Sequence, residues 1–194
     1  MVTSGYGHKT NAEMIKDTVL IALFAALMGV GALSARFITV SFFGVPITLQ
    51  IMFAYIAGVV LGPRKGAIAM VLYLCLGLAG IPVFAQPPYG SPAYLFIPTF
   101  GFLLGFVGLA WLSGLLTTKS KNILFLFMSG LLGLGLAYVI GIVYFYIIKN
   151  FYLSESVNII NLAAKIISSF FLIDFIKIIF AMGIIKALER VRMK

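Results

Sequence analysis

Six apolar stretches follow one another along the chain, separated by short segments that contain charged residues, glycine or proline. Within each stretch the apolar residues are nearly continuous and do not alternate with polar ones, which is typical of buried or lipid-facing helices and unlike the strands of a membrane barrel. The pattern predicts six helices, over residues 18–35, 47–61, 67–78, 93–116, 123–148 and 157–188.

The polar segments indicate how the chain is organised. The first ten residues, MVTSGYGHKT, are polar and precede any apolar stretch, so we expect residues 1–15 to form a flexible tail. Residues 62–66, Gly-Pro-Arg-Lys-Gly, predict a tight turn between the second and third helices. No other segment is polar enough to be a soluble domain, and residues 16–194 are therefore predicted to form a single six-helix membrane domain.

Composition supports a membrane protein. Apolar residues make up 62% of the chain and charged residues 10%, with a mean hydropathy of +1.15. A soluble domain averages about 45–50% apolar and about 25% charged residues. Because so few charges cannot cover a water-facing surface, and a spanning helix needs roughly 20 apolar residues, the sequence predicts an all-α integral membrane protein.

The 14 lysine and arginine residues are distributed unevenly between alternate connections. One side receives Arg36, Lys149 and Lys165, while Lys177 lies within the last helix. The other side receives ten, and this excess of ten over three predicts six transmembrane helices with both termini in the cytoplasm, since positive residues favour the cytoplasmic side. The basic residues form no stripe, so nucleic-acid binding is not expected. The other side receives ten basic residues: Lys9, Lys16, Arg64, Lys65, Lys119, Lys121, Lys186, Arg190, Arg192 and Lys194.

Motifs of known catalytic sites are absent from the sequence. There is no G-x-x-x-x-G-K-[ST], G-x-S-x-G or H-E-x-x-H, and four of the five acidic residues lie at helix edges or between helices. The single cysteine, Cys75, excludes an internal disulfide and a cysteine-rich metal site, and the single histidine, His8, lies in the tail. We therefore expect no enzyme, no catalytic residue, no metal and no cofactor.

Asp174 is the exception among the acidic residues, because it lies within the sixth apolar stretch, three residues before Lys177. This spacing places both side chains on one helical face, one turn apart. Each charge costs roughly 2.5–3.5 kcal/mol within a membrane and such residues usually mark a functional site. One interpretation is an ion pair that only neutralises itself and fixes helix packing. The interpretation we favour is a binding site for a ligand that carries both amide-like donors and a carboxylate.

Gln50 is a second polar candidate, at the outer end of the second stretch. Its amide donates and accepts, which suits a ureido or amide group, and the alternative interpretation is a solvated helix end. The outer connections, residues 36–46, 80–92 and 149–156, form either an apolar lid over an outward-facing pocket or an ordinary interfacial anchor. They carry Phe42, Phe43, Pro82, Phe84, Pro87, Pro88, Tyr89 and Pro92.

Ala22 and Ala26 form a small-xxx-small pair in the first stretch, which allows another backbone to approach closely. The partner is either a helix of another subunit or a helix of this chain.

Several motifs, in chain order, resemble those of the BioY family, the biotin-specific S-components of energy-coupling-factor (ECF) transporters. The resemblance extends from the first to the sixth stretch. The chain departs from the family at Phe100 and Phe102, where the family usually has Gly and Tyr within Pro-Thr-Gly-Gly-Tyr. The matching motifs are Pro46-Ile47-Thr48-Leu49-Gln50, Gly62-Pro63-Arg64-Lys65-Gly66, Gly77-Leu78-Ala79-Gly80-Ile81-Pro82-Val83-Phe84, the segment from Pro98 to Phe106, and Asp174-Phe175-Ile176-Lys177.

The resemblance implies a substrate-binding subunit of the bacterial cell membrane that captures biotin from outside. In the family, this subunit docks on a transmembrane coupling subunit (EcfT type) and two ABC-type ATPases, which fits the missing P-loop. By the same resemblance, Ala22 and Ala26 contact the coupling subunit.

Biotin is then the transported ligand and not a cofactor. Its ureido group offers N–H donors and its valerate chain carries a carboxylate, so the resemblance implies polar contacts with Asp174 and Lys177. The orientation of biotin between them stays open. The expected ligand-binding residues are Asp174, Lys177, Gln50 and the aromatic residues Tyr73, Phe84 and Tyr89.

Two other functions are compatible with the same residues. The first is an S-component for a different vitamin, with the same fold and a different pocket. The second is a non-transporting membrane interaction subunit, for which no small-molecule affinity is expected.

Overall fold

Six α-helices dominate the fold, as the apolar pattern predicts. The computed structural model describes residues 10–37, 41–42, 45–120 and 122–192, so the expectations for His8, Lys9, Phe43, Lys121 and Lys194 lie outside the described residues. The elements, in order, are α1 (Asn11–Phe37), β1 (Ser41–Phe42), β2 (Val45–Pro46), α2 (Gln50–Leu61), α3 (Pro63–Leu78), the 3-10 helix η1 (Pro92–Phe96), α4 (Phe100–Leu116), α5 (Ile123–Ile147), the π-helix η2 (Ile148–Tyr152) and α6 (Ile159–Arg192).

Polar side chains set the beginnings of three helices. Thr10 accepts a hydrogen bond from the Glu13 N–H, and the Glu13 carboxylate accepts one from the Thr10 N–H. This reciprocal capping box starts α1 at Asn11, so residues 11–15, expected in the flexible tail, are helical. Asn122 caps α5 through the Phe125 N–H, and Asn158 caps α6 through the N–H groups of Ile160 and Asn161.

The predicted turn at residues 62–66 is shorter than expected. Only Gly62 separates α2 from α3, with a φ of 83° that favours glycine, and Pro63 occupies the first turn of α3. Nearby, a Cβ on Gly58 would lie 2.2 Å from the carbonyl oxygen of Ala110. The absence of a side chain at Gly58 therefore lets α2 pack directly against the backbone of α4.

Two helices begin later than their apolar stretches. Helix α2 starts at Gln50, and α4 starts at Phe100 because residues 92–96 form η1. The two helices have 12 and 17 residues, whereas the segments Asn11–Ala35 and Ile123–Tyr152 are both long and apolar enough to cross a bilayer. Length and composition together therefore support two of the six predicted spans.

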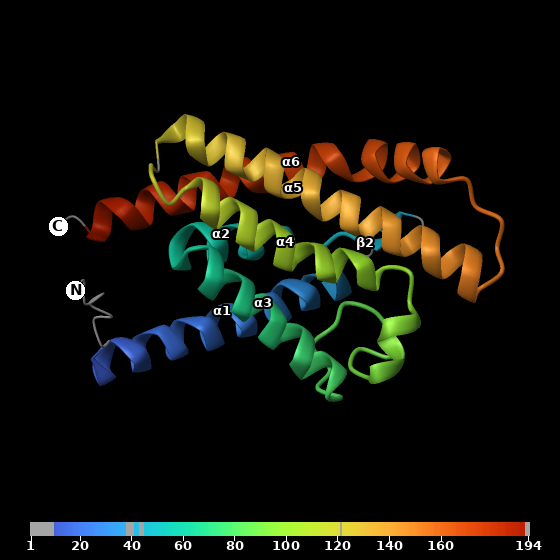
Figure 1. Ribbon diagram of the computed structural model, residues 1–194, viewed down its shortest axis with the longest axis horizontal. Helices are drawn as coiled ribbons and strands as arrows, with labels where there is room; N and C mark the ends of the chain where they lie inside the picture. The colour runs from blue at the N-terminus through green and yellow to red at the C-terminus, as the bar shows by residue number, and fades with distance from the viewer. Residues whose placement is uncertain (1–9, 38–40, 43–44, 121, 193–194) are drawn as a thin grey trace, which may run out of the picture.

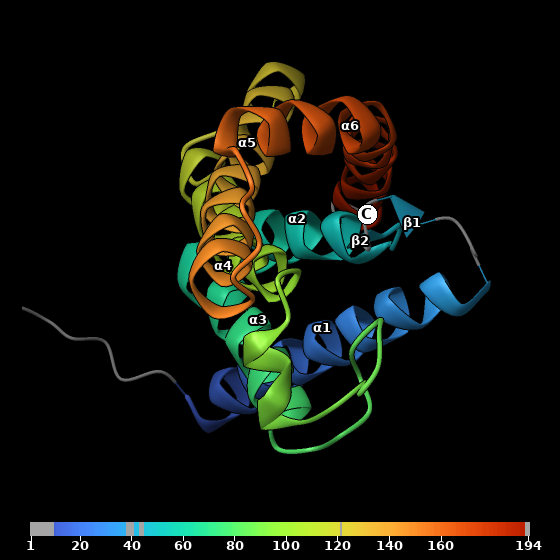
Figure 2. The ribbon, with the colours of Figure 1, turned by 90° about the vertical axis from the view of Figure 1, so that its right-hand side faces the viewer.

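The helices form three successive tiers, α5 with α6, α2 with α4, and α1 with α3 (Figure 2). Hairpin β1–β2, paired antiparallel, connects α1 to α2. The beginning of α1 and the end of α6 lie at one end of the bundle, and the α3–α4 and α5–α6 connections lie at the other (Figure 1). An even number of passes through the bundle brings both ends of the chain to the same end.

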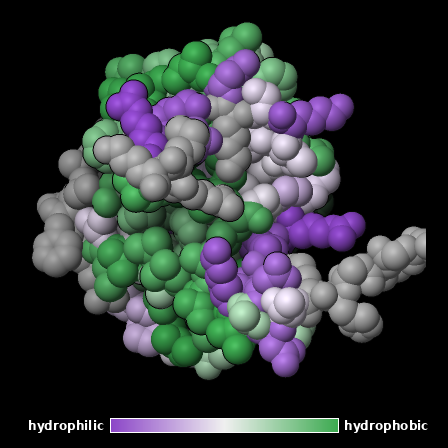
Figure 3. Space-filling view, turned by 90° about the vertical axis from the view of Figure 1, so that its left-hand side faces the viewer, coloured by the Kyte–Doolittle hydropathy of each residue, from purple (hydrophilic) through white to green (hydrophobic). Residues whose placement is uncertain are grey.

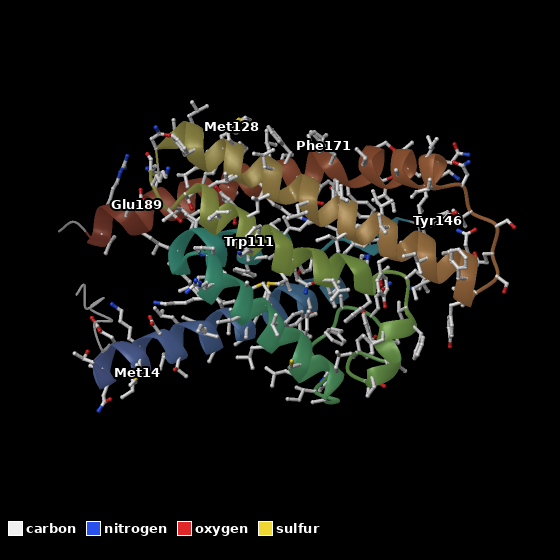
Figure 4. All side chains as sticks on the ribbon, viewed as in Figure 1. Met14, Trp111, Met128, Tyr146, Phe171 and Glu189 are labelled. Atoms are coloured by element: carbon white, nitrogen blue, oxygen red, sulfur yellow. The ribbon has the colours of Figure 1, made fainter. Side chains whose placement is uncertain are left out.

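Apolar side chains cover much of the outside. Met128 and Phe171 project outward from the edge formed by α5 and α6 (Figure 4), and they are 45% and 44% exposed. Hydrophilic side chains protrude from the end of the bundle that carries the chain termini, with hydrophobic surface between them (Figure 3). This exterior fits contact with lipid along the flanks of the bundle.

Candidate functional site

A cavity of about 50 Å³ lies where α2, α4, α5 and α6 meet, beside β2. We call it the Asp174 cavity. Four of its lining residues are polar or charged, and they come from three different parts of the chain. Its walls are Val45, Pro46, Ile47, Thr48, Ile51, Phe102, Phe106, Ala137, Tyr138, Ile166, Phe170, Asp174 and Lys177.

Asp174 is the centre of the polar group in this cavity and is only 3% exposed. Its Oδ1 accepts a hydrogen bond of 2.9 Å from Lys177 Nζ, which forms the predicted ion pair one helical turn away. Its Oδ2 accepts a hydrogen bond of 2.7 Å from the Tyr138 hydroxyl on α5. The cluster therefore offers a ligand both carboxylate acceptors and an ammonium donor, with no net charge when Asp174 and Lys177 are ionised.

A second cavity, of about 40 Å³, lies on the other side of a shared wall. We call it the Gln50 cavity. Val45, Pro46, Thr48, Phe102 and Phe106 line both cavities. The remaining walls of the Gln50 cavity are Gln50, Ala85, Gln86, Tyr94, Thr99 and Leu103, so the outer connection between α3 and α4 supplies most of its polar groups.

Gln50 is 2% exposed, and its side chain is fixed by a hydrogen bond to Tyr73. Its Nε2 donates to the Tyr73 hydroxyl over 2.9 Å, and that hydroxyl donates to the carbonyl of Val83. In the same outer connection, burial raises the pKa of the Tyr94 phenol to about 12, so the phenol stays protonated at physiological pH.

Of the aromatic residues expected to bind the ligand, none lines the two cavities. Phe84 is fully buried in a cluster with Tyr73, Tyr94 and Phe100, with ring centroids 4.3–6.4 Å apart. This cluster packs the connection between α3 and α4 against α3. Phe84 and Tyr73 therefore stabilise the residues around the cavities without lining them. Tyr89 has a φ of 61° and closes a turn through its carbonyl, which accepts from the Phe84 N–H.

The structure thus brings Asp174 and Lys177 together in one cavity and places Gln50 in the adjoining one. Ala22 and Ala26 lie far along the chain from both and are exposed on α1, whereas their neighbour Ala25 is buried. The outer connections take part in the site, because Val45, Pro46, Ala85 and Gln86 line the cavities.

Sequence reasoning missed several of the residues in these walls. Tyr138 carried one usable signal, since a tyrosine in the middle of an apolar helix needs a partner for its hydroxyl. Phe106 and Phe170 carried none, because they look like any other apolar residue of a membrane helix. Phe102 stood out only as a departure from the family motif and not as a wall of a cavity. Thr99 lies within a motif that matches the family, but neither Thr99 nor Gln86 was predicted to line the site.

The site has the composition of a pocket for an organic molecule. Among the described residues, no group of three histidine, cysteine, aspartate or glutamate side chains is placed to hold a metal ion. A few convergent polar groups in a mostly apolar cavity are typical of small-molecule binding sites.

A six-helix bundle with an apolar exterior and a buried, partly charged cavity defines a class, the membrane-embedded ligand-binding proteins. Within this class, the chain belongs to the BioY family, whose sequence profile matches residues 6–194. The protein is accordingly a membrane protein.

Several relatives of this chain are described as biotin transporters. The chain is 38% identical to the probable biotin transporter BioY of Lysinibacillus sphaericus over 138 residues, which are 70% of this chain and 67% of that protein. It is 35% identical to the biotin transporter BioY of Thermotoga maritima, over 73% of this chain and 78% of the relative. For the biotin transporter BioY of Rhodobacter capsulatus, the identity is 34% over 86% of this chain and 89% of the relative.

The fold also has a close counterpart among solved structures. The crystal structure of the S-component for biotin from an ECF-type ABC transporter matches with a TM-score of 0.75. The match covers 94% of this chain and 95% of the other, at 24% sequence identity. This likeness establishes the six-helix fold independently of the apolar pattern.

Proposed function

We propose that this protein is the substrate-binding subunit of an ECF-type importer and that it captures biotin from outside the cell. The observation that carries the proposal is the Tyr138–Asp174–Lys177 cluster in a buried cavity of a BioY-family chain. Relatives at 34–38% identity are described as biotin transporters, and the chain itself has no P-loop with which to hydrolyse ATP.

The chemistry of the two cavities suits biotin. Biotin has a ureido group and a carboxylate separated by an apolar thioether ring and a methylene chain. Polar groups lie in both cavities, and four of the five shared wall residues are apolar. In the present conformation each cavity is smaller than a biotin molecule, and we propose that the shared wall at Phe102 and Phe106 moves when the ligand binds.

Within this proposal, Asp174, Lys177 and Gln50 contact the ligand, and Tyr138 fixes the orientation of Asp174. Tyr73 and Phe84 position Gln50 and the outer connection. Tyr89 shapes the turn that begins at Gln86.

The proposed topology has six spans and both termini in the cytoplasm. Two observations support it: the beginning of α1 and the end of α6 share one end of the bundle (Figure 1), and ten basic residues against three favour that end as cytoplasmic. The Asp174 cavity is then reached from the outer end.

The proposed partners are a transmembrane coupling subunit of the EcfT type and two ABC-type ATPases. The exposed Ala22 and Ala26 on α1 support a docking face for the coupling subunit, because small residues allow close approach of a partner helix.

The test of the proposal is a titration of the purified protein with biotin, combined with mass spectrometry of any ligand that is purified with it. Saturable binding of biotin, competed by no other vitamin, supports the proposal. A different vitamin found in the purified protein would favour the same fold with another substrate. Absence of any small-molecule binding would favour an interaction subunit instead.

A further inference from the structure

Asp174 and Gln50 are 3% and 2% exposed, so a ligand needs a passage to reach the cavities they line. A third hollow lies next to the Gln50 cavity, at the end of α5. We call it the Lys149 groove. It has a volume of about 300 Å³ and is lined by Pro87, Ile97, Pro98, Phe145 and Lys149, together with two residues of the Gln50 cavity.

Those two residues are Gln86 and Thr99, which line both the Lys149 groove and the Gln50 cavity. They therefore form the partition between the groove and the interior. The Thr99 hydroxyl donates a hydrogen bond of 3.0 Å to Gln86 Oε1, which closes this partition. Thr99 directly precedes α4, whereas Gln86 lies earlier in the same connection between α3 and α4, so a shift of the part that carries Gln86 separates them.

Lys149 gives the groove its charge. Its ammonium donates to both carboxylate oxygens of Glu155, over 2.8 and 2.7 Å. The Glu155 side chain is 52% exposed, and an ion pair this exposed contributes about 0–1 kcal/mol. An incoming carboxylate can therefore replace Glu155 at little cost.

The groove also lies where a ligand from outside would arrive. The connection between α3 and α4 and the end of α5 are at the end of the bundle opposite to the chain termini (Figure 1). With the proposed topology, this is the outer end.

We propose that the Lys149 groove is the access site for the carboxylate-bearing ligand. Lys149 attracts the carboxylate, and opening of the Gln86–Thr99 hydrogen bond admits the ligand first to the Gln50 cavity and then to the Asp174 cavity. The inference rests on the proposed function, because the carboxylate is that of biotin.

The first test bridges the partition. Gln86→Cys and Thr99→Cys are combined with Cys75→Ser and cross-linked by a short, reducible bis-methanethiosulfonate. We expect association of tritiated biotin to slow at least tenfold after cross-linking and to recover on reduction. Equal association rates with and without the bridge would overturn the route while leaving the proposed function intact.

The second test removes the positive charge of Lys149 in protein that carries no cross-link. In Lys149→Met, the groove loses its positive charge while the exposed Glu155 keeps its negative charge, and we expect a several-fold slower association with biotin at low salt and no change in dissociation, because electrostatic attraction acts on the association rate. The matched control is Lys165→Met, since Lys165 is an exposed lysine that lines none of these hollows. Equal association rates for both variants would overturn the role of Lys149.

The ester of biotin provides an internal control, because it lacks the carboxylate charge. Its association should be insensitive to Lys149→Met and sensitive to the cross-link. If the Cys75→Ser parent binds no biotin at all, the proposed function fails, and the inference fails with it.

Discussion

Tyr138 on α5 and Asp174 on α6 are joined by a hydrogen bond of 2.7 Å inside a mostly apolar cavity. Because Lys177 donates to the other carboxylate oxygen, each oxygen of Asp174 already has one donor before a ligand arrives. The carboxylate is therefore fixed in orientation by two helices. Such preorganisation reduces the conformational entropy that the binding site loses when a ligand binds.

Tyr138→Phe tests this relationship, because it keeps the ring and removes the hydroxyl. This hydrogen bond is already present before the ligand arrives, so its loss weakens binding by freeing a carboxylate that must be ordered again on binding. We expect biotin affinity to fall several-fold, as measured by calorimetry on folded protein. The control is Tyr146→Phe on the same helix, a position that lines none of the cavities described above (Figure 4). Equal affinities of the two variants would contradict the role of Tyr138.

Asp174→Asn and Lys177→Met separate a binding site from a merely structural ion pair. Each variant leaves an unpaired partner in a buried position, so some loss of thermal stability is expected in both. If the pair binds biotin, affinity should also fall by about one to two decades in protein that remains folded. If both folded variants bind biotin as the parent does, the site assignment is wrong and Gln50 with the outer connections becomes the leading candidate.

The sequence predicted the number of helices because continuous apolar stretches carry a strong signal. It also singled out Asp174 and Lys177 because charge within such a stretch is costly. The start of α1 before residue 16 could also have been predicted, since Thr10 and Glu13 have the spacing of a capping box. The later start of α4 also had a signal, since Pro98 is unfavourable inside a helix and precedes its first residue by two positions. The later start of α2 had a weaker one, because residues 47–49 are nearly as apolar as the helix that follows.

The walls of the cavities could not be predicted for a different reason. Phe84 and Phe102 are both phenylalanines of the segment from α3 to α4, yet Phe84 is enclosed in an aromatic cluster and Phe102 lines both cavities. Their difference depends on which helices lie opposite, which is a tertiary property. Gly77 illustrates this, because a Cβ there would lie 2.1 Å from the Phe84 ring, and only the folded structure shows that the glycine leaves room for it.

Cysteine labelling tests the topology. In a Cys75→Ser background, which removes an exposed cysteine, Tyr89→Cys and Lys149→Cys should react with a membrane-impermeant maleimide in intact cells. Lys119→Cys and Arg190→Cys, at the opposite end, should react only after permeabilisation. The reversed pattern would place the termini outside and contradict the distribution of basic residues as a guide to orientation.

Ala22 and Ala26 are expected to act in assembly and not in binding, because both are exposed on α1. Replacing them together by leucine should abolish biotin uptake and co-purification with the coupling subunit, while biotin affinity of the isolated protein is unchanged. Ala25→Leu is the matched control, since Ala25 is buried and the larger side chain should lower the thermal stability. Weaker biotin binding in the Ala22/Ala26 variant would show that these alanines pack within the bundle.

Gly141 and Gly135 on α5 provide a matched pair for testing whether Phe102 forms the movable wall of the site. A Cβ on Gly141 would lie 2.3 Å from Cδ1 of Phe102, whereas a Cβ on Gly135 would meet nothing within 4 Å. Both Gly→Ala changes raise helix propensity by about 1 kcal/mol, so this contribution cancels in the comparison.

The difference between the two variants therefore isolates the contact with Phe102. Gly141→Ala displaces the Phe102 ring, and the space available to the ring includes the two cavities that it lines. We expect biotin affinity to fall at least tenfold in Gly141→Ala and to stay at the parental value in Gly135→Ala, with both proteins folded by circular dichroism. Restoration of binding by a smaller side chain, in Gly141→Ala/Phe102→Leu, would identify the displaced ring as the cause. Parental affinity in Gly141→Ala would instead show that the Phe102 ring can turn aside without reducing the space for ligand, and the shared wall would then have to be sought at Phe106.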